Sequence, residues 1–478
     1  MLEQLEPKSV FAYFEAISQI PRGSGNCGAI ADFIEAFGVS HGLSVTRDAW
    51  DNVILRAPAS PGMENAPAVM LQGHTDMVCE KVHGSAHDFL RNPLPLRTDG
   101  EWVWSEGTTL GADDGVAVAM ILAILADETA VHPALECVFT TDEEIGLVGA
   151  QQLDLSGCRA KYLINLDCDV DGMLIAGCCG GACMQYRIPL AKETRSGAGK
   201  RLVIDGLAGG HSGAEIHKNG GNAVRLMARL LSDAMGSAPG EFAVVSIEGG
   251  NKDNVIPSRC EAVVLGTGAF DAAFAKLYAE YKDREPSLGL TVEDVPLADA
   301  AVLTSASGAG LLRFLREAPC GVQYMHDKVE GLVDTSANLA DVHFDGEAAW
   351  GTVSVRSTTT EGKNGVCHRI AALLSEVGGT WERSGDYPGW AYAENSVLRE
   401  LMADTWEDLF GEKAKVEVIH AGLECGVLLE KMPELDIISY GPEILSIHSP
   451  AERLNIASTE KNYRFLLEVL KRLGTHAA

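Results

Sequence analysis

Short apolar runs alternate with amphipathic stretches from the start of the chain to about Cys183. Three of these runs lie in AVMLQGHTDMV, ALECVFTTDEE and KYLINLDCD, and each has four or more apolar residues before it ends in polar ones. Strands that are buried on both faces of a parallel sheet have this pattern. The stretch GVAVAMILAILAD predicts a helix between them. The segment therefore predicts an α/β domain, a mostly parallel sheet with helices on both faces.

The pattern changes between residues 184 and 382. Strand-like pieces such as EFAVVSIE, CEAVVLG and AAWGTVSVRS alternate there with surface helices such as GNAVRLMARLLSDAM. After residue 383 a helix, VLRELMADTWEDLFG, and strand signals such as LDIISYGPEI return, and the chain closes with a helix in STEKNYRFLLEVLKRLG. A length of 478 residues also favours two domains. We expect a discontinuous first domain, residues 1–183 and 383–478, and an inserted α+β domain, residues 184–382.

Composition and charge narrow the function classes. The net charge of −29 would repel phosphate backbones and anionic membranes, which argues against nucleic-acid and membrane partners and leaves small molecules or peptides. The first residues lack the basic start and apolar run of a secretory signal, and every apolar run is too short to span a bilayer. We expect a cytoplasmic protein, in which the 12 cysteines are reduced residues rather than a disulfide framework.

Ligand-type side chains follow the predicted strands or lie in a glycine-flanked turn. Open α/β sheets place their active sites at the carboxyl ends of parallel strands. The candidate residues are His74 after VMLQG, Asp113 in GTTLGADDG, Glu143 and Glu144 after ALECVFTTD, Asp167 after KYLINL, and His448 after ILSI. Their convergence in space is inferred from topology.

Each candidate taken alone has a structural interpretation, such as a hydrogen-bonded histidine or an aspartate that caps a helix. As a set, imidazole and several carboxylates suit zinc or a similar divalent ion, and five ligands suit two ions better than one. Adjacent side chains point in different directions, so Glu144 can bind a metal while Glu143 faces a water molecule. In His74-Thr75-Asp76, period-two spacing lets Asp76 hold the imidazole, with a purely structural role as the alternative.

Several segments resemble one peptidase family over nearly the whole chain. GHTDMVCEK, AHDF, GTTLGADDG, HPALECVFTTDEEIGLVGA, LINLD, GGHSG, NVIP, HAGLECG and SIHSP are similar to the aminoacyl-histidine (Xaa-His) dipeptidases. These are relatives of carnosinase within a large group of dizinc peptidases and deacylases. The motifs run from Gly73 to Pro450, and the combination of GTTLGADDG with the Asp-Glu-Glu motif is the most specific part.

The resemblance implies a role for each matching residue. Two ions are expected, zinc first and manganese or cobalt as alternatives, with Asp113 bridging them, His74 and Asp167 completing one site, and Glu144 and His448 completing the other. The implied catalytic residues are Glu143 as general base, Asp76 as the residue that orients His74, and His211 of GGHSG as an oxyanion donor. The implied substrate-binding residues are Asn254, Arg356 and Glu424. For His211 and Arg356, a turn histidine and a surface charge are the structural alternatives.

The implied activity is hydrolysis of Xaa-His dipeptides such as β-alanyl-histidine, through attack by a water held between the ions. A broader aminopeptidase or an N-acyl amino acid deacylase with the same metal site is the alternative. A non-catalytic binding protein is a third possibility. A protein that had lost its activity would be expected to lose a metal ligand or the general base, and this sequence keeps all of these residues. A small peptide is the expected partner, and the assembly is expected to be a monomer or a homodimer.

Overall fold

The computed structural model describes residues 1–2, 4–237, 242–327 and 331–475, and these form two compact units. Unit 1 comprises residues 1–178, 390–418 and 423–478, and unit 2 comprises residues 179–389 and 419–422. The expected domain boundaries at 183/184 and 382/383 fall inside two strands of unit 2, β9 (Gly180–Pro189) and β18 (Thr380–Tyr387). A hydrophobic pattern marks a strand but does not say which sheet it joins, so the boundaries could not be placed more closely.

Unit 1 is built on an eight-stranded sheet in the order β1-β2-β6-β3-β7-β20-β8-β19. The central strands β6, β3, β7 and β20 are parallel, whereas β1, β2 and β8 pair antiparallel at the flanks. The α/β prediction is confirmed, with the parallel part in the middle of the sheet. The strands are β1 (Ser44–Arg47), β2 (Val53–Ala57), β3 (Val69–His74), β6 (Leu135–Thr140), β7 (Tyr162–Asn165), β8 (Met173–Cys178), β19 (Lys415–Ile419) and β20 (Asp436–Ser439).

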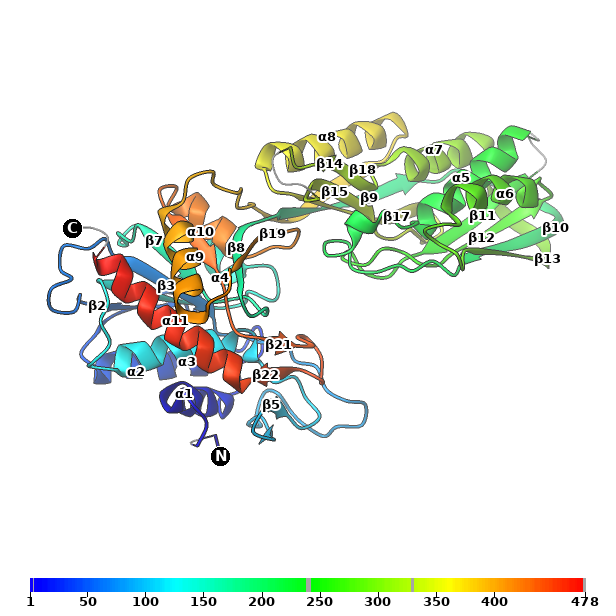
Figure 1. The fold of residues 1–478 in the computed structure, drawn as a ribbon. Helices are drawn as coiled ribbons and strands as arrows, with labels where there is room; N and C mark the ends of the chain where they lie inside the picture. The colour runs from blue at the N-terminus through cyan, green and yellow to red at the C-terminus, as the bar shows by residue number, and fades with distance from the viewer. Residues whose placement is uncertain (3, 238–241, 328–330, 476–478) are drawn as a thin grey trace. The chain divides into compact units, whose positions relative to one another are not determined.

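The central strands are buried on both faces. Every residue of β3, β6 and β7 is buried, which explains why apolar residues predominate in these strands. One face of the sheet shares a hydrophobic core with the helices α1 (Lys8–Ser18), α2 (Gly28–Ser40), α3 (Ala112–Ala126), α9 (Val397–Phe410) and α11 (Ile456–Thr475) (Figure 1). Two short helices, α4 (Val148–Gln152) and α10 (Cys425–Lys431), contact each other.

Helix α3 is the most deeply buried helix of this core. Its apolar residues surround it on all sides, as expected for a helix enclosed by the protein. Gly73 allows α3 to approach β3 closely, because a Cβ at this position would lie only 2.7 Å from the Cβ of Ala117. The close approach brings the first turn of α3 beside the carboxyl end of β3.

A small antiparallel sheet in unit 1 has the order β21-β22-β5-β4. Its strands are β4 (Leu96–Thr98), β5 (Trp102–Ser105), β21 (Ile444–Leu445) and β22 (Arg453–Asn455). The loop between β21 and β22 contains residues 446–452. None of the helices in the described ranges combines the length and the apolar composition needed to cross a membrane.

Unit 2 contains two antiparallel sheets, in the orders β11-β12-β10-β13 and β14-β15-β17-β9-β18, with β16 paired to β17. The helices α5 (Ala223–Ser237), α6 (Phe270–Tyr281), α7 (Ser305–Glu317) and α8 (Thr360–Glu376) lie along one side of these sheets (Figure 1). The remaining strands are β10 (Lys192–Asp205), β11 (Phe242–Gly249), β12 (Cys260–Gly266), β13 (Gly289–Leu303), β14 (Gly321–Met325), β15 (Val333–Leu339), β16 (His343–Phe344) and β17 (Ala348–Ser357). Unit 2 is therefore an α+β fold.

Candidate metal and catalytic site

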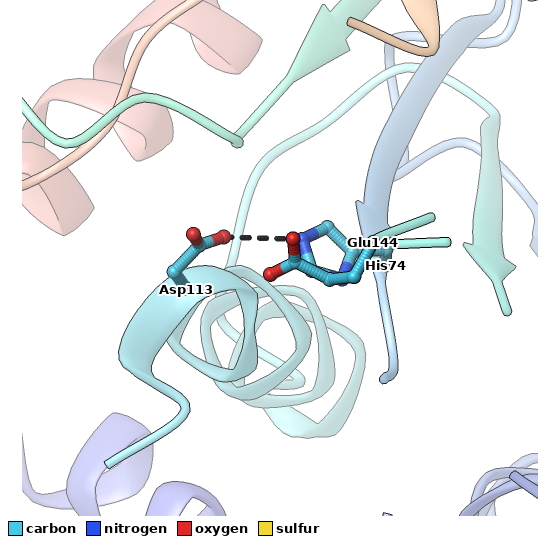
Figure 2. Close-up of side chains that lie close together, drawn as sticks. All are labelled: His74, Asp113 and Glu144. Carbon is cyan, nitrogen blue, oxygen red and sulfur yellow. Dashed lines mark hydrogen bonds and ion pairs between the residues drawn. The ribbon is translucent and has the colours of Figure 1, made fainter. Parts of the chain in front are cut away.

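The candidate ligands of unit 1 gather at the carboxyl ends of the parallel strands. His74 is the last residue of β3, Glu144 follows β6, and Asp113 lies in the first turn of α3. Figure 2 shows these three side chains pointing toward one another. Asp167 follows β7, as the apolar run before it predicted.

His448 reaches the site from a different element than expected. The run ILSI predicts a strand of the parallel sheet, but only Ile444 and Leu445 form a strand, β21, and it belongs to the small antiparallel sheet. The expected position of His448 at the end of a parallel strand is therefore wrong, although the residue does join the cluster. Three apolar residues in a run of four are too few to show which sheet a strand enters.

Asp113 lies between two histidines. Its Oδ1 is 3.1 Å from Nε2 of His74, and its Oδ2 is 3.1 Å from Nε2 of His448. The same Nε2 of His448 is 3.0 Å from Oε1 of Glu144. Each oxygen of one carboxylate thus faces one imidazole, an arrangement suited to a carboxylate that bridges two cations.

A second group of candidate ligands consists of His74, Asp114 and Asp167, whose ligand atoms lie within 4.8 Å of one another. Asp114 was not among the predicted residues. It is 1% exposed, and its Oδ2 accepts a hydrogen bond from the backbone N–H of His74 at 3.2 Å. The adjacent aspartates in GTTLGADDG were the one signal for it, and either of them fits a helix start.

Asp76 contacts both His74 and the backbone of the Glu143-Glu144 segment. Nδ1 of His74 is 3.1 Å from the carbonyl oxygen of Asp76 and 3.3 Å from its Oδ1, so Nε2 is the ring nitrogen that faces Asp113. The Asp76 carboxylate also accepts hydrogen bonds from the Ser24 hydroxyl and from the backbone N–H groups of Glu143 and Glu144. One carboxylate therefore fixes both the imidazole and the Glu143-Glu144 segment.

The cluster concentrates acidic groups away from solvent. Burial raises the pKa of Asp167 to about 8, and the neighbouring Asp113 adds to the rise. Burial, followed by Asp167 and Glu424, raises the pKa of Glu143 well above its usual range. Hydrogen bonds to Asp113 and Glu144 raise the pKa of His448 to about 11. Without added positive charge, the cluster has to hold protons near neutral pH.

This donor set fits divalent cations. Imidazole nitrogens and carboxylate oxygens are the ligands that zinc binds in proteins, and ions would supply the positive charge that the buried carboxylates lack. The acidic residues of the cluster are Asp76, Asp113, Asp114, Glu143, Glu144, Asp167 and Glu424.

Glu424 lies beneath the site and is fully buried. Its Oε2 accepts hydrogen bonds from Nε2 of Gln72 at 2.5 Å and from the Thr140 hydroxyl at 2.6 Å. Its Oε1 is buried and has no hydrogen-bond partner among the described residues. Burial raises the pKa of Glu424 to about 7.

The remaining candidates, His211, Asn254 and Arg356, belong to unit 2. Nδ1 of His211 accepts hydrogen bonds from the backbone N–H groups of Gly213 and Ala214, at 3.2 and 3.0 Å, so the ring proton is on Nε2. Burial and the charge of Arg356 lower the pKa of His211. His211 is therefore a neutral imidazole that can donate a hydrogen bond through Nε2.

Asn254 and Arg356 have fewer contacts of their own. Asn254 is exposed, and its backbone carbonyl accepts a hydrogen bond from the N–H of Ser212 at 2.8 Å. Nη1 of Arg356 donates to the hydroxyl of Tyr387 at 3.4 Å, and its Nε is buried without a hydrogen-bond partner in the described part of the chain.

Comparison with known proteins gives consistent results along the chain. Residues 70–472 match the family described as Peptidase family M20/M25/M40. The chain is 35% identical to the cytosol non-specific dipeptidase of Escherichia coli (strain K12), over 99% of both proteins. It is also similar to the crystal structure of aminoacylhistidine dipeptidase from Vibrio alginolyticus, with a TM-score of 0.91, 32% identity, and coverage of 99% and 98%. An aminopeptidase from Bacillus cereus shares the fold, with a TM-score of 0.58, 15% identity, and coverage of 98% and 99%.

Proposed function

This chain belongs to peptidase family M20/M25/M40, and we propose that it is a metal-dependent dipeptidase that cleaves Xaa-His dipeptides such as β-alanyl-histidine. Its full-length similarity to two proteins named as dipeptidases supports the reaction class. The histidine preference is supported by the name of the Vibrio relative. The Escherichia coli relative is named a non-specific dipeptidase, which makes a broader dipeptidase the second candidate.

The observation that carries the proposal is the position of Asp113, with one histidine Nε2 at 3.1 Å from each of its carboxylate oxygens. We propose two divalent ions, zinc first and manganese or cobalt as alternatives. The proposed ligands are His74, Asp113 and Asp167 for one ion and Asp113, Glu144 and His448 for the other. When bound, such ions lower the pKa of water and polarise a scissile carbonyl.

Glu143 is the proposed general base. Burial and neighbouring carboxylates raise the pKa of Glu143, so its side chain can take up a proton from the attacking water and pass it to the leaving amine. Asp76 fixes the backbone N–H of Glu143 at 3.0 Å and so holds this segment in place.

Four further residues are proposed to act on the substrate. His211 suits an oxyanion because its Nδ1 accepts backbone hydrogen bonds, which leaves the ring proton on Nε2 as a donor. Arg356 has a planar fork that matches a carboxylate, and Asn254 adds an exposed amide. The unpartnered Oε1 of Glu424 suits an ammonium group. A cytoplasmic location is proposed because the Escherichia coli relative is named a cytosol enzyme.

Metal removal followed by a substrate panel tests the function. A chelator should abolish hydrolysis, and zinc, manganese or cobalt should restore it. The panel contains β-alanyl-histidine, ordinary dipeptides, tripeptides and N-acetyl amino acids. Equal rates on all dipeptides would favour the broader dipeptidase, a preference for N-acetyl amino acids would favour a deacylase, and full activity without metal would refute the proposal.

A substitution of the proposed base tests the mechanism. Glu143→Gln should retain both ions and lose kcat by about 10²- to 10⁴-fold, because it cannot accept a proton. Glu128→Gln, at an exposed position of the same unit, is the control and should keep wild-type kcat. An active Glu143→Gln enzyme would show that the base is assigned to the wrong residue.

A further inference from the structure

Glu452 binds the loop that carries Asp113. Glu452 is 2% exposed and lies at the end of the loop between β21 and β22. Its Oε2 accepts hydrogen bonds from the backbone N–H groups of Leu110 and Gly111 at 2.7 and 2.9 Å. Its Oε1 accepts from those of Ala112 and Asp113 at 2.8 and 3.3 Å. Both carboxylate oxygens thus hold consecutive peptide groups that end at Asp113.

These peptide groups need an acceptor. The first N–H groups of a helix have no partner within the helix, and α3 begins at Ala112 in a fully buried place. A negative charge at a helix start is also favourable because of the helix dipole. Glu452 meets both requirements.

Arg22, which carries the opposite charge to Glu452, also binds this loop. The Arg22 side chain is 1% exposed, and its Nη2 donates to the carbonyl oxygen of Gly111 at 2.5 Å. Its Nη1 donates to the carbonyl oxygens of Thr75 and Asp76 at 3.0 and 3.2 Å. One guanidinium therefore joins the Asp113 loop to the segment that follows His74.

The neighbouring glycines show how closely the guanidinium fits. A Cβ at Gly111 would lie 2.7 Å from Nη2 of Arg22, and a Cβ at Gly115 would lie 2.4 Å from it. Gly111 also donates its N–H to Glu452, so this one residue is held on both sides by opposite charges. The glycines of the GTTLGADDG motif leave room for the arginine as well as forming a turn.

We propose that Glu452 and Arg22 are positioning residues that fix the backbone of Asp113 so that its two oxygens reach both proposed metal sites. The inference rests on the proposed two-ion function. A bridging ligand has to be held within roughly 0.5 Å of its productive position, and four backbone contacts to one carboxylate provide that restraint. Since Glu452 lies four residues after His448, one loop supplies a ligand and also places the bridging ligand.

If Glu452 only stabilised the fold, its substitution would lower stability without changing metal affinity. Glu136 provides the matched control for this alternative. Glu136 is 7% exposed in unit 1, and its carboxylate accepts hydrogen bonds from the backbone N–H groups of Arg159 and Ala160 at 2.9–3.0 Å. It lies near the amino end of β6, roughly 13 Å along the strand from Thr140 at about 3.3 Å per residue. Glu136→Gln therefore damages a similar buried contact without touching a ligand loop.

The experiment compares the wild-type protein, Glu452→Gln and Glu136→Gln after chelator treatment. Zn²⁺ affinity and stoichiometry are measured by competition with a chromophoric chelator, Co²⁺ coordination by visible absorption, and stability by thermal unfolding of the metal-free proteins. Glu452→Gln should bind its weaker ion about 10- to 100-fold less tightly and change the Co²⁺ spectrum. Glu136→Gln should lose thermal stability and keep wild-type affinity.

Wild-type affinity and an unchanged Co²⁺ spectrum in Glu452→Gln would overturn the positioning role. If Glu452→Gln does not fold, Arg22→Lys is tested instead. A lysine ammonium keeps the charge but cannot donate both to Gly111 and to the segment after His74 as the guanidinium does. This variant should weaken Zn²⁺ binding in the same direction, and unchanged binding would overturn the inference. A wild-type protein that binds fewer than two ions would instead refute the proposed function.

Discussion

Glu424→Gln is expected to stabilise the metal-free protein at pH 8 by up to about 3 kcal/mol. The buried carboxyl of Glu424 has a pKa raised to about 7 from an ordinary value of 4.5. One pKa unit corresponds to about 1.4 kcal/mol, so this difference gives an upper bound of about 3 kcal/mol. The glutamine carbonyl can still accept from Gln72 and Thr140, while its NH₂ takes the place of the unpartnered Oε1.

The sign follows from proton binding. Between pH 4.5 and 7 the folded protein holds a proton on Glu424 that the unfolded chain has lost, so this group's contribution makes stability fall as pH rises. The cost is complete above pH 7 and is under about 1 kcal/mol at pH 5. The neutral glutamine carries no such cost, and the variant should gain over wild type only at the higher pH.

Calorimetric unfolding of chelator-treated protein at pH 5 and pH 8 measures the difference. A gain of about 3 kcal/mol corresponds to a rise in Tm of roughly 3–6 °C at pH 8, the lower value if the whole chain unfolds together and the higher if unit 1 unfolds alone. Glu128→Gln, at an exposed position, should leave Tm unchanged at both pH values. Added divalent ions should reduce the gain, since nearby cations stabilise the ionised carboxylate. An equal shift at both pH values, or a lower Tm at pH 8, would refute the reasoning.

Two further predictions concern metal uptake and helix stability. Binding of metal ions to the metal-free protein at pH 7 should release protons, and the metal affinity should rise with pH. The reason is that Asp167 and His448, with pKa values of about 8 and about 11, must lose protons before they can bind an ion. Binding heats that are the same in buffers of different ionisation enthalpy would contradict this. In α8, Gly365→Ala should raise the free energy of unfolding by about 1 kcal/mol, because its Cβ would meet open space. Gly362→Ala should lower it, because its Cβ would lie 2.5 Å from Oγ of Ser357, and urea unfolding compares the two variants.

The sequence predicted the part of the site that depends on strand ends. His74 and Asp167 follow apolar runs that form β3 and β7, and parallel pairing brings their carboxyl ends together. His448 required more, because the strand before it, β21, joins a separate antiparallel sheet. The run ILSI placed His448 among the candidates, but it predicted the wrong sheet, and the assignment of His448 to an ion came from the resemblance of SIHSP to a family motif.

The buried charges around the ligands could not be predicted from local sequence. A single glutamate in the sequence carries no signal that tells whether it will be buried or exposed. Glu452 also binds backbone groups that lie about 340 residues away along the chain. Burial of such a group follows from which backbone N–H groups lack a partner once the chain has folded. That information exists only in the assembled structure.

The same chemistry recurs elsewhere in the molecule without a ligand nearby. Glu136 in unit 1 and Glu285 in unit 2 are buried carboxylates that also accept backbone N–H groups of loops. A buried carboxylate that completes a loop is therefore a common structural device in this chain. Glu452 differs because the loop it completes contains Asp113, so any displacement of that loop changes both oxygens that face the histidines. A role in metal binding then depends on which loop is held, and this is why Glu136→Gln can separate lost stability from lost positioning.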